Sequence, residues 1–441
     1  MALLDTTPTS LGDYETAGGL RGLQRALSSS PDAVIEEVAS SGLRGRGGAG
    51  FPTGEKWRAI RGSGSGTRYA VCNAAEGEPA TFKDRLLLRT NPYQVLEGLA
   101  IAAYAVGAER AYVGLKEVFA FEAGSLARAL EEMKAADALA GIPVEVLRGP
   151  DHYLLGEETG LLEAIEQRDP LPRILRPFMQ GLFATAEANN PTLVNNVETL
   201  ANVPHVIAEG QDWLRSAGTE TSPGTMLFTV AMDVRVEGVF ELPLGTPLRS
   251  LIQDSAGGPR EGRAIKVMIP GASSTALIPE QLDTPLDFES MLQVGSGLGA
   301  GGFAVLDESA CIVQVAALFS RFLYVESCGQ CPPCKLGSGE ITDLLDRFEQ
   351  GEGEIADLDT VLVRAKTVTD GQKCALPTGE SLLVQSLLQT FGREFAAHLR
   401  QPCPSSRELV LPKIVDYDPS AGRFTYDDRY RLKQPDWTYA A

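Results

Sequence analysis

Three cysteines within seven residues constrain what this chain can fold around more than any other feature. Residues 326–335 read Glu-Ser-Cys-Gly-Gln-Cys-Pro-Pro-Cys-Lys, and a further cysteine follows later in the chain. Thiols at i, i+3 and i+6 can wrap a single iron–sulfur cube, with the last ligand supplied from elsewhere. Zinc is the rival interpretation, but four-cysteine zinc sites usually pair two Cys-x2-Cys knuckles. The spacing therefore favours a [4Fe–4S] cluster, and its four candidate ligands are Cys328, Cys331, Cys334 and Cys374.

The remaining cysteines indicate a reducing environment. The chain has seven cysteines, an odd number, and no apolar signal segment follows its first residues. A disulfide framework is therefore not expected, and we predict a cytoplasmic setting. The other cysteines are isolated and the histidines have no metal-ligand spacing, so all are predicted to be structural. They are Cys72, Cys311, Cys403, His152, His205 and His398.

Charge and hydropathy exclude two classes of partner. The chain carries 58 Asp and Glu against 39 Lys and Arg, a net charge of −19 at pH 7. Such an excess of negative charge disfavours nucleic acid and anionic membrane surfaces as partners. No apolar run approaches the roughly 18 residues that a bilayer-spanning helix needs. We therefore expect neither nucleic-acid binding nor direct membrane insertion.

Residues 1–220 alternate strand-like and helix-like segments. Ser30 and Pro31 read as a helix cap followed by a first-turn proline. The alternation has a βαβ rhythm, which predicts an α/β domain. The expected strands are 69–73, 112–115 and 144–147, and the expected helices are 95–106 and 120–135.

The pattern changes twice in the second half of the chain. Residues 221–306 hold short strands at 226–232 and 264–269 between Gly and Pro turns, which predicts a small α+β domain. Residues 307–400 carry apolar helical stripes on both sides of the cysteine motif, which predicts a helical domain around the cluster. Residues 401–441 are rich in Pro, Asp and Tyr, and we expect an extended tail that lies on this or a neighbouring subunit.

A loop with six glycines, residues 42–54, is the second strong signal. It contains a formal G-x-G-x-x-G match from Gly45, but a helix precedes it where the dinucleotide fingerprint requires a strand. A flexible surface loop is the simplest alternative. Dense glycines nevertheless let a backbone approach a flat ring or a phosphate closely, and Arg46 and Lys56 could supply positive charge.

Three polar segments lie in the same α/β domain, at residues 73–85, 156–159 and 191–199. Carboxylates and amides in such runs are commonly helix caps and turn formers. Their joint presence with the glycine loop argues for a shared functional site.

Taken in order, these motifs resemble the NADH-oxidising flavoprotein subunit of respiratory complex I and its relatives in NAD-linked hydrogenases and formate dehydrogenases. The resemblance covers residues from about 30 to 400 and rests on five motifs. They are the glycine loop, Asn-Ala-x-Glu-x-Glu-Pro from Asn73, Gly-Glu-Glu-Thr from Gly156, Asn-Asn-Val-Glu-Thr-Leu-Ala-Asn from Asn195, and the cysteine motif with its distant Cys374. It implies an α/β flavin-binding domain, then a small ubiquitin-like β-grasp domain of the soluble-ligand-binding type, then a C-terminal helical iron–sulfur domain.

The resemblance also implies cofactors and their contacts. FMN rather than FAD would accept a hydride from NAD(H) or NADP(H) and release electrons singly to the [4Fe–4S] cluster. Glu78 and Glu158 would make polar contacts near the nicotinamide and ribose at the catalytic centre, and Phe51 and Phe178 would contact the dinucleotide. The residues that would surround FMN are Gly45, Arg46, Gly47, Gly48, Gly50, Lys56, Asn73, Glu76, Gly156, Glu157, Asn195, Asn196 and Thr199.

Several positions depart from the family pattern. Ala75 replaces a usual acidic residue, Ala80 a usual glycine and Leu155 a common cysteine. Leu175 stands where a lysine normally meets the nucleotide, and the adjacent Arg176 differs from lysine in reach and geometry. These departures concern the nucleotide site and leave the cluster motif intact.

Two main classes of function follow. The first is a catalytic diaphorase subunit of a multisubunit oxidoreductase, and the second is a non-catalytic electron relay or scaffold whose nucleotide site has decayed. The retained carboxylates Glu78, Glu157 and Glu158 favour the first, because burying unused carboxylates is costly. A zinc-stapled binding module is a third alternative. With one clustered cysteine set, electrons must leave through partners, which the resemblance implies are a small thioredoxin-like [2Fe–2S] subunit and a further catalytic or electron-transfer subunit.

Overall fold

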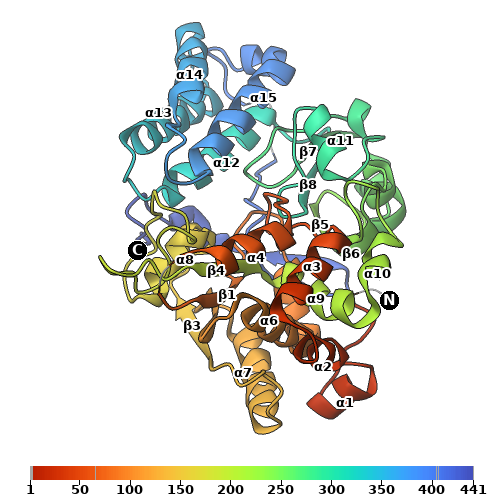
Figure 1. Cartoon of the computed structure of the whole chain (residues 1–441). Helices are drawn as coiled ribbons and strands as arrows, with labels where there is room; N and C mark the ends of the chain where they lie inside the picture. The colour runs from red at the N-terminus through yellow and green to blue at the C-terminus, as the bar shows by residue number, and fades with distance from the viewer. Residues whose placement is uncertain (1–2, 65, 404, 406, 441) are drawn as a thin grey trace.

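A four-stranded parallel sheet forms the centre of the N-terminal α/β region. The computed structural model describes residues 3–64, 66–403, 405 and 407–440 (Figure 1). The strand order is β3-β2-β1-β4, and every pairing is parallel. The strands are β1 (Tyr69–Ala74), β2 (Arg110–Lys116), β3 (Val144–Gly149) and β4 (Thr192–Asn196). The first three occur where the sequence predicts them, whereas β4 falls in a segment that reads as polar turns.

Helices cover both faces of this sheet because the strand residues alternate between two apolar clusters. Ala70 and Cys72 face the cluster that includes α6 (Pro92–Val106) and α9 (Val197–Glu209). Val71 faces the opposite cluster, which includes α8 (Glu158–Ile165). The other helices of the region are α1 (Leu11–Thr16), α2 (Arg21–Leu27), α3 (Pro31–Ser41), α4 (Thr53–Gly62), α5 (Lys83–Thr90), α7 (Ala120–Ala135) and α10 (Gln211–Arg215).

The local sequence explains where the expected helices start and stop. The Ser30 side chain caps α3 by accepting a hydrogen bond from the Ala33 N–H. Asn91 caps α6 in the same way, and the helix ends at Gly107, whose φ of 71° suits glycine. The helix before the glycine loop and both longer expected helices are thereby confirmed.

A second, mixed sheet follows. Its order is β6-β5-β8-β7, with β5 and β8 parallel and the outer pairs antiparallel. The elements are β5 (Thr225–Met232), β6 (Gly238–Pro243), β7 (Ile265–Ile269), β8 (Gly302–Asp307) and the short helix α11 (Phe288–Gln293). The sequence predicts β5 and β7 but not the other two strands.

Four helices carry the cysteine motif and gather at one end of the molecule (Figure 1). They are α12 (Ile312–Glu326), α13 (Pro332–Glu349), α14 (Ile355–Thr367) and α15 (Leu376–Ala397). The two predicted apolar stripes correspond to α12 and α15, which pack into one buried cluster. Within the described part of the chain, no helix combines the length and apolar character needed to cross a membrane.

The C-terminal segment is not simply extended. It forms an antiparallel hairpin of β9 (Ile414–Asp418) and β10 (Arg423–Tyr426), then a short 3-10 turn, η5 (Asp428–Leu432). It packs on this chain: the Pro412 carbonyl accepts from the Ala80 N–H at 2.7 Å, and buried Lys433 pairs with Glu326 at 2.8 Å. The segment therefore ties the α/β region to the helical region.

Candidate functional site

A cleft opens at the carboxyl ends of β1 and β4. The chain leaves β1 toward β2 on one side and returns to β4 on the other, so the cleft lies at the topological switch point, where open α/β sheets bind ligands. Eleven of its lining residues come from the glycine loop and the three polar segments: Gly47, Asn73, Ala75, Glu76, Gly77, Glu78, Thr81, Asp84, Gly156, Glu157 and Asn196. The fold thus brings residues of all four motifs, the glycine loop and the three polar segments, to one site.

The glycine loop presents backbone rather than side chains to this cleft. The loop is closed by a 2.8 Å bond from the Gly45 N–H to the Phe51 carbonyl. A Cβ on Gly47 would lie 3.1 Å from the Asn196 Cβ, and one on Gly50, whose φ is +61°, would lie 2.5 Å from the Phe288 ring. At Gly50 the Phe288 ring takes the space that a side chain would need, whereas Gly47 lines the cleft, and its missing side chain lets a flat ring lie against the backbone there.

The Arg46 side chain does not face the cleft, which corrects the expectation that it supplies charge to the flavin. Its guanidinium donates to the carbonyls of Pro223 at 3.2 Å and Thr225 at 3.0 Å, and burial lowers its pKa to about 10. Its backbone N–H donates to the Thr199 hydroxyl at 2.9 Å. Arg46 and Thr199 therefore fix the glycine loop in place, and Thr199 is not among the residues that line the cleft.

Two carboxylates of the Asn73 motif, Glu76 and Glu78, lie partly buried in the cleft wall. Glu76 accepts hydrogen bonds from the N–H groups of Asp84 and Arg85 at 3.3 and 3.2 Å, and burial, with the charge of Asp84, raises its pKa to about 7. Glu78 accepts from the Tyr153 hydroxyl and the Ala272 N–H, both at 2.5 Å, and burial raises its pKa. Each carboxylate is held in one orientation by two donors.

The helix-cap interpretation applies to Glu157 and Asn196, although both line the cleft. Glu157 caps α8 by accepting from the N–H groups of Thr159 and Gly160 at 2.8 Å, and burial raises its pKa. Asn196 caps α9, with its Oδ1 accepting from the Glu198 N–H at 3.0 Å. Capping fixes these side chains at the rim, so the two roles are compatible.

A buried charge network that sequence reasoning missed lies beneath the cleft. Lys83 lies 2.7 Å from the Asp84 carboxylate and 2.9 Å from that of Glu198. Burial alone would lower the pKa of Lys83, but these two negative charges raise it above its ordinary value. Asp84 also accepts from the Asn196 amide at 2.6 Å.

The sequence signal that could have revealed this network is the Phe-Lys-Asp-Arg run that follows the Glu78 motif. Tyr153, also missed, carries no comparable signal.

Besides Arg46 and Thr199, eight expected contact residues lie outside the cleft lining: Gly45, Gly48, Gly50, Phe51, Lys56, Glu158, Phe178 and Asn195. Asn195 is buried and accepts from the Trp57 indole at 2.8 Å, which gives it a packing role. Lys56 forms an ion pair with Glu158, and both are partly exposed. Phe51 and Phe178 are 56% and 46% exposed. Exposed rings of this kind form a surface on which a larger ligand could stack.

The four motif cysteines converge on a second, much smaller cavity. Cys328 precedes α13, Cys331 caps it, Cys334 lies in its first turn, and Cys374 arrives just before α15. Among the described residues, no three of these sulfur atoms lie within 4.8 Å of one another. A single tetrahedral zinc would hold its sulfurs about 3.8 Å apart, so no three of these sulfur atoms are placed as ligands of one zinc ion.

Burial raises the pKa of the Cys334 thiol to about 11 and that of Cys374 to about 12. Because a cluster is ligated by thiolates, its assembly here must release these protons.

The cleft and the cysteine cavity share a wall. Leu154, Cys374 and Leu376 line both spaces. One residue layer, which includes a cluster ligand, therefore separates the cleft from the cysteine cavity.

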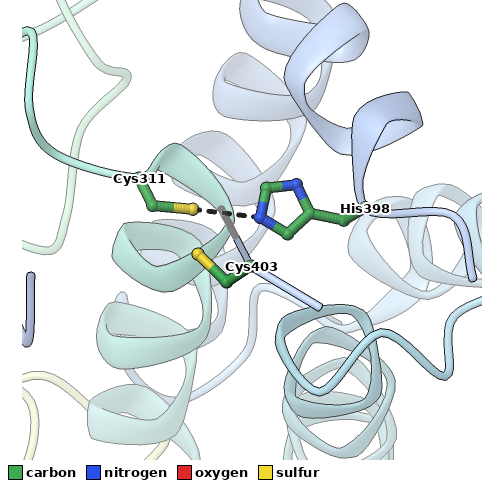
Figure 2. Close-up of side chains that lie close together, drawn as sticks. All are labelled: Cys311, His398 and Cys403. Atoms are coloured by element: carbon green, nitrogen blue, oxygen red, sulfur yellow. Dashed lines mark hydrogen bonds between the residues drawn. The ribbon is translucent and has the colours of Figure 1, made fainter. Parts of the chain in front are cut away.

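The structure also corrects one expectation about the remaining cysteines and histidines. Cys311, His398 and Cys403 are not isolated, because their ligand atoms all lie within 4.8 Å of one another (Figure 2). Cys72, by contrast, is buried in β1 as a packing residue.

Comparison with known proteins is consistent with this geometry. Residues 38–205 match the Nuo51 FMN-binding domain, and residues 314–398 match the NADH-ubiquinone oxidoreductase-F iron–sulfur binding region. The chain is 41% identical over 407 residues to the F 2 subunit of the NADH-quinone oxidoreductase of Rhizobium meliloti (strain 1021), spanning 89% of this chain and 96% of that protein. The chain belongs to this family. The match confirms the predicted family, its FMN-binding domain and its iron–sulfur region.

Hydrogenase proteins are also similar. The HndC subunit of the NADP-reducing hydrogenase of Solidesulfovibrio fructosivorans is 37% identical over 410 residues, covering 90% of this chain and 82% of that one. An NAD⁺-reducing [NiFe]-hydrogenase, solved in its H2-reduced state, superposes with a TM-score of 0.78 at 35% identity. That alignment covers 85% of this chain and 64% of the hydrogenase chain, so the hydrogenase chain has substantial sequence outside the matched part.

Proposed function

We propose that this chain oxidises NADH as the flavin-bearing subunit of a multisubunit oxidoreductase, with FMN in the cleft and a [4Fe–4S] cluster in the adjacent cavity. The observation that carries the proposal is the shared wall of Leu154, Cys374 and Leu376. Two cofactors separated by one residue layer can exchange electrons without a further carrier in this chain.

The cleft residues hold and orient the flavin in this proposal. FMN supplies the hydride-accepting chemistry and the conversion from two-electron to one-electron transfer. The Gly47 backbone leaves room for the ring, while Asn73 and Asn196 present polar groups at the ends of β1 and β4. The Asn73 amide is already fixed by a 2.7 Å bond to the Gly156 carbonyl. A pocket fixed in advance needs little rearrangement to align nicotinamide and flavin.

The nucleotide would enter past the exposed aromatic residues. Phe51 and Phe178 offer stacking surfaces for its rings, and Glu78 offers a partly buried polar contact inside the cleft. The Lys56–Glu158 ion pair would bind the ribose region. Leu175 is exposed and apolar, so Arg176 is the neighbouring cation available to a 2′-phosphate.

The finer domain and partner assignments belong to the same proposal. The units are a flavin domain (1–220), a β-grasp domain (221–306), a helical cluster domain (307–400) and a C-terminal segment (401–441). A thioredoxin-like [2Fe–2S] subunit and a further electron-transfer or catalytic subunit would take the electrons onward. All seven cysteines are free, as suits a reducing cytoplasmic setting.

An anaerobic absorption titration of the reconstituted protein tests the proposal. NADH, and separately NADPH, is added to protein carrying FMN and iron. We expect NADH to bleach the flavin band stoichiometrically, and the response to NADPH reports what Leu175 and Arg176 do. Flavin that dithionite reduces but neither nucleotide touches would refute NADH oxidation and leave an electron relay with a decayed nucleotide site.

A further inference from the structure

Three side chains of types that ligate metals come together from separate segments (Figure 2). They meet at the start of α12, the end of the helix that lies away from the cysteine motif. Cys311 caps the start of α12, His398 ends α15, and Cys403 lies in the segment that follows. The Cys311 sulfur is 3.3 Å from the His398 Nε2. Because the 15 residues of α12 separate Cys311 from the cluster loop, this group lies about 20 Å from the cluster cavity. It is therefore a second and independent group.

The imidazole is oriented as in metal sites. The His398 Nδ1 lies 2.8 Å from the Glu394 carbonyl, and a carbonyl only accepts hydrogen bonds, so Nδ1 must carry the proton. In the neutral ring this leaves the Nε2 lone pair directed toward Cys311. A backbone partner that fixes the tautomer and the ring orientation is typical of ligating histidines.

The surroundings hold the three groups in place. Cys311 is 4% and His398 0% exposed, whereas Cys403 is half-buried. The Cys403 N–H donates to the Glu349 carbonyl at the end of α13, at 3.3 Å. The group thus gathers the ends of three helices, with solvent able to reach it beside Cys403.

We propose that Cys311, His398 and Cys403 bind one Zn²⁺ ion, with a water molecule in the fourth position. Thiolate and imidazole are the ligands zinc prefers, and a tetrahedral zinc places its S and N ligands about 3.5 Å apart, close to the separation seen here. On binding, each thiol gives up its proton to solvent and each sulfur forms one bond to the metal, with no change of oxidation state.

The site would anchor the C-terminal segment. Beyond Cys403 that segment runs over the α/β region, where the Ile414 carbonyl accepts from Arg85 at 3.0 Å. A metal bond at its start would fix it to α12 and α15, whose other ends flank the cluster loop. The ion is structural in this role, and it goes beyond the flavin and cluster chemistry proposed above.

Metal analysis of the intact holoprotein tests the site. Protein is purified anaerobically from zinc-supplemented cells, and zinc, iron and FMN are measured together, so that full iron content shows the cluster cavity to be occupied by its cluster. We expect one zinc per chain, and Zn K-edge absorption showing two sulfur, one nitrogen and one oxygen ligand. C311S, H398Q and C403S should each lower zinc more than tenfold with iron and FMN unchanged, while C72A, which changes a packing cysteine, should keep it.

Three results would overturn the assignment. They are wild-type protein with a full iron content and no bound zinc, zinc retained in C403S, and a Cys311–Cys403 disulfide found by mass spectrometry after anaerobic alkylation. The X-ray absorption result on wild-type protein decides the matter even if a variant fails to fold.

Discussion

Replacing Glu380 by glutamine should remove a large pH dependence of stability from the helical region. Glu380 lies on α15 with 0% exposure. Its Oε1 accepts from the Ser320 hydroxyl at 2.6 Å, but its Oε2 has no hydrogen-bond partner among the residues that the structure describes. Burial raises its pKa from 4.5 to about 8. The carboxyl is therefore neutral in the folded protein at pH values where the unfolded chain ionises it.

The sign and size follow from linkage. A raised acid pKa contributes stability that is fully present below pH 4.5 and is lost as the pH rises through about 8. At 1.36 kcal/mol per pH unit, the loss reaches about 5 kcal/mol as an upper value. Glutamine keeps the shape and the acceptor for Ser320 but cannot ionise. E380Q should match the wild type near pH 5 and exceed it by several kcal/mol at pH 9.

Thermal unfolding of the anaerobic holoprotein across this pH range measures the effect, and E340Q is the matched control. Glu340 is a partly exposed carboxylate on α13, paired with Arg364. The E380Q melting temperature should exceed that of the wild type by several degrees at pH 9 and by little at pH 5, while E340Q shows no such divergence. Infrared spectroscopy should show a protonated carboxyl band at pH 7 that E380Q lacks. Parallel wild-type and E380Q curves would refute the reasoning.

Three further predictions concern the site and its frame. G47V should weaken FMN binding more than tenfold, because a side chain there enters the cleft, whereas G62A, with nothing within 4 Å of its added Cβ, should bind FMN normally in a fluorescence titration. C374S should lose the cluster by iron analysis while retaining FMN; retention of all iron would remove Cys374 from the ligand set. K433M should destabilise the protein by roughly 3–5 kcal/mol, because it leaves the buried Glu326 carboxylate without its cation. An unchanged melting temperature would show that this pair contributes little.

The sequence predicts best those features that residues close in the chain determine. The cysteine loop is one, since the spacing of its cysteines alone favours a [4Fe–4S] cluster over a zinc site built from two Cys-x2-Cys knuckles. The strand at 226–232 is another, because a run of apolar residues specifies it locally. By contrast β4, five residues long and ending in two asparagines, is a strand because it pairs with β1. That pairing is a long-range contact with no local signal.

The same distinction explains the corrections in the site. The Arg46 side chain points away from the cleft because its guanidinium donates to the carbonyls of Pro223 and Thr225, which are more than 170 residues away in the sequence. Cys311 and His398 are 87 residues apart and meet only because α12 and α15 pack together. Neither arrangement can be read from residue spacing.

Electron paramagnetic resonance of the anaerobic protein after NADH addition tests the central claim, that the cleft and the cysteine cavity work as one electron path. The shared wall of Leu154, Cys374 and Leu376 predicts that NADH alone, without a mediator, produces the signal of the reduced cluster. A flavin that NADH bleaches beside a cluster that only dithionite can reduce would contradict the account.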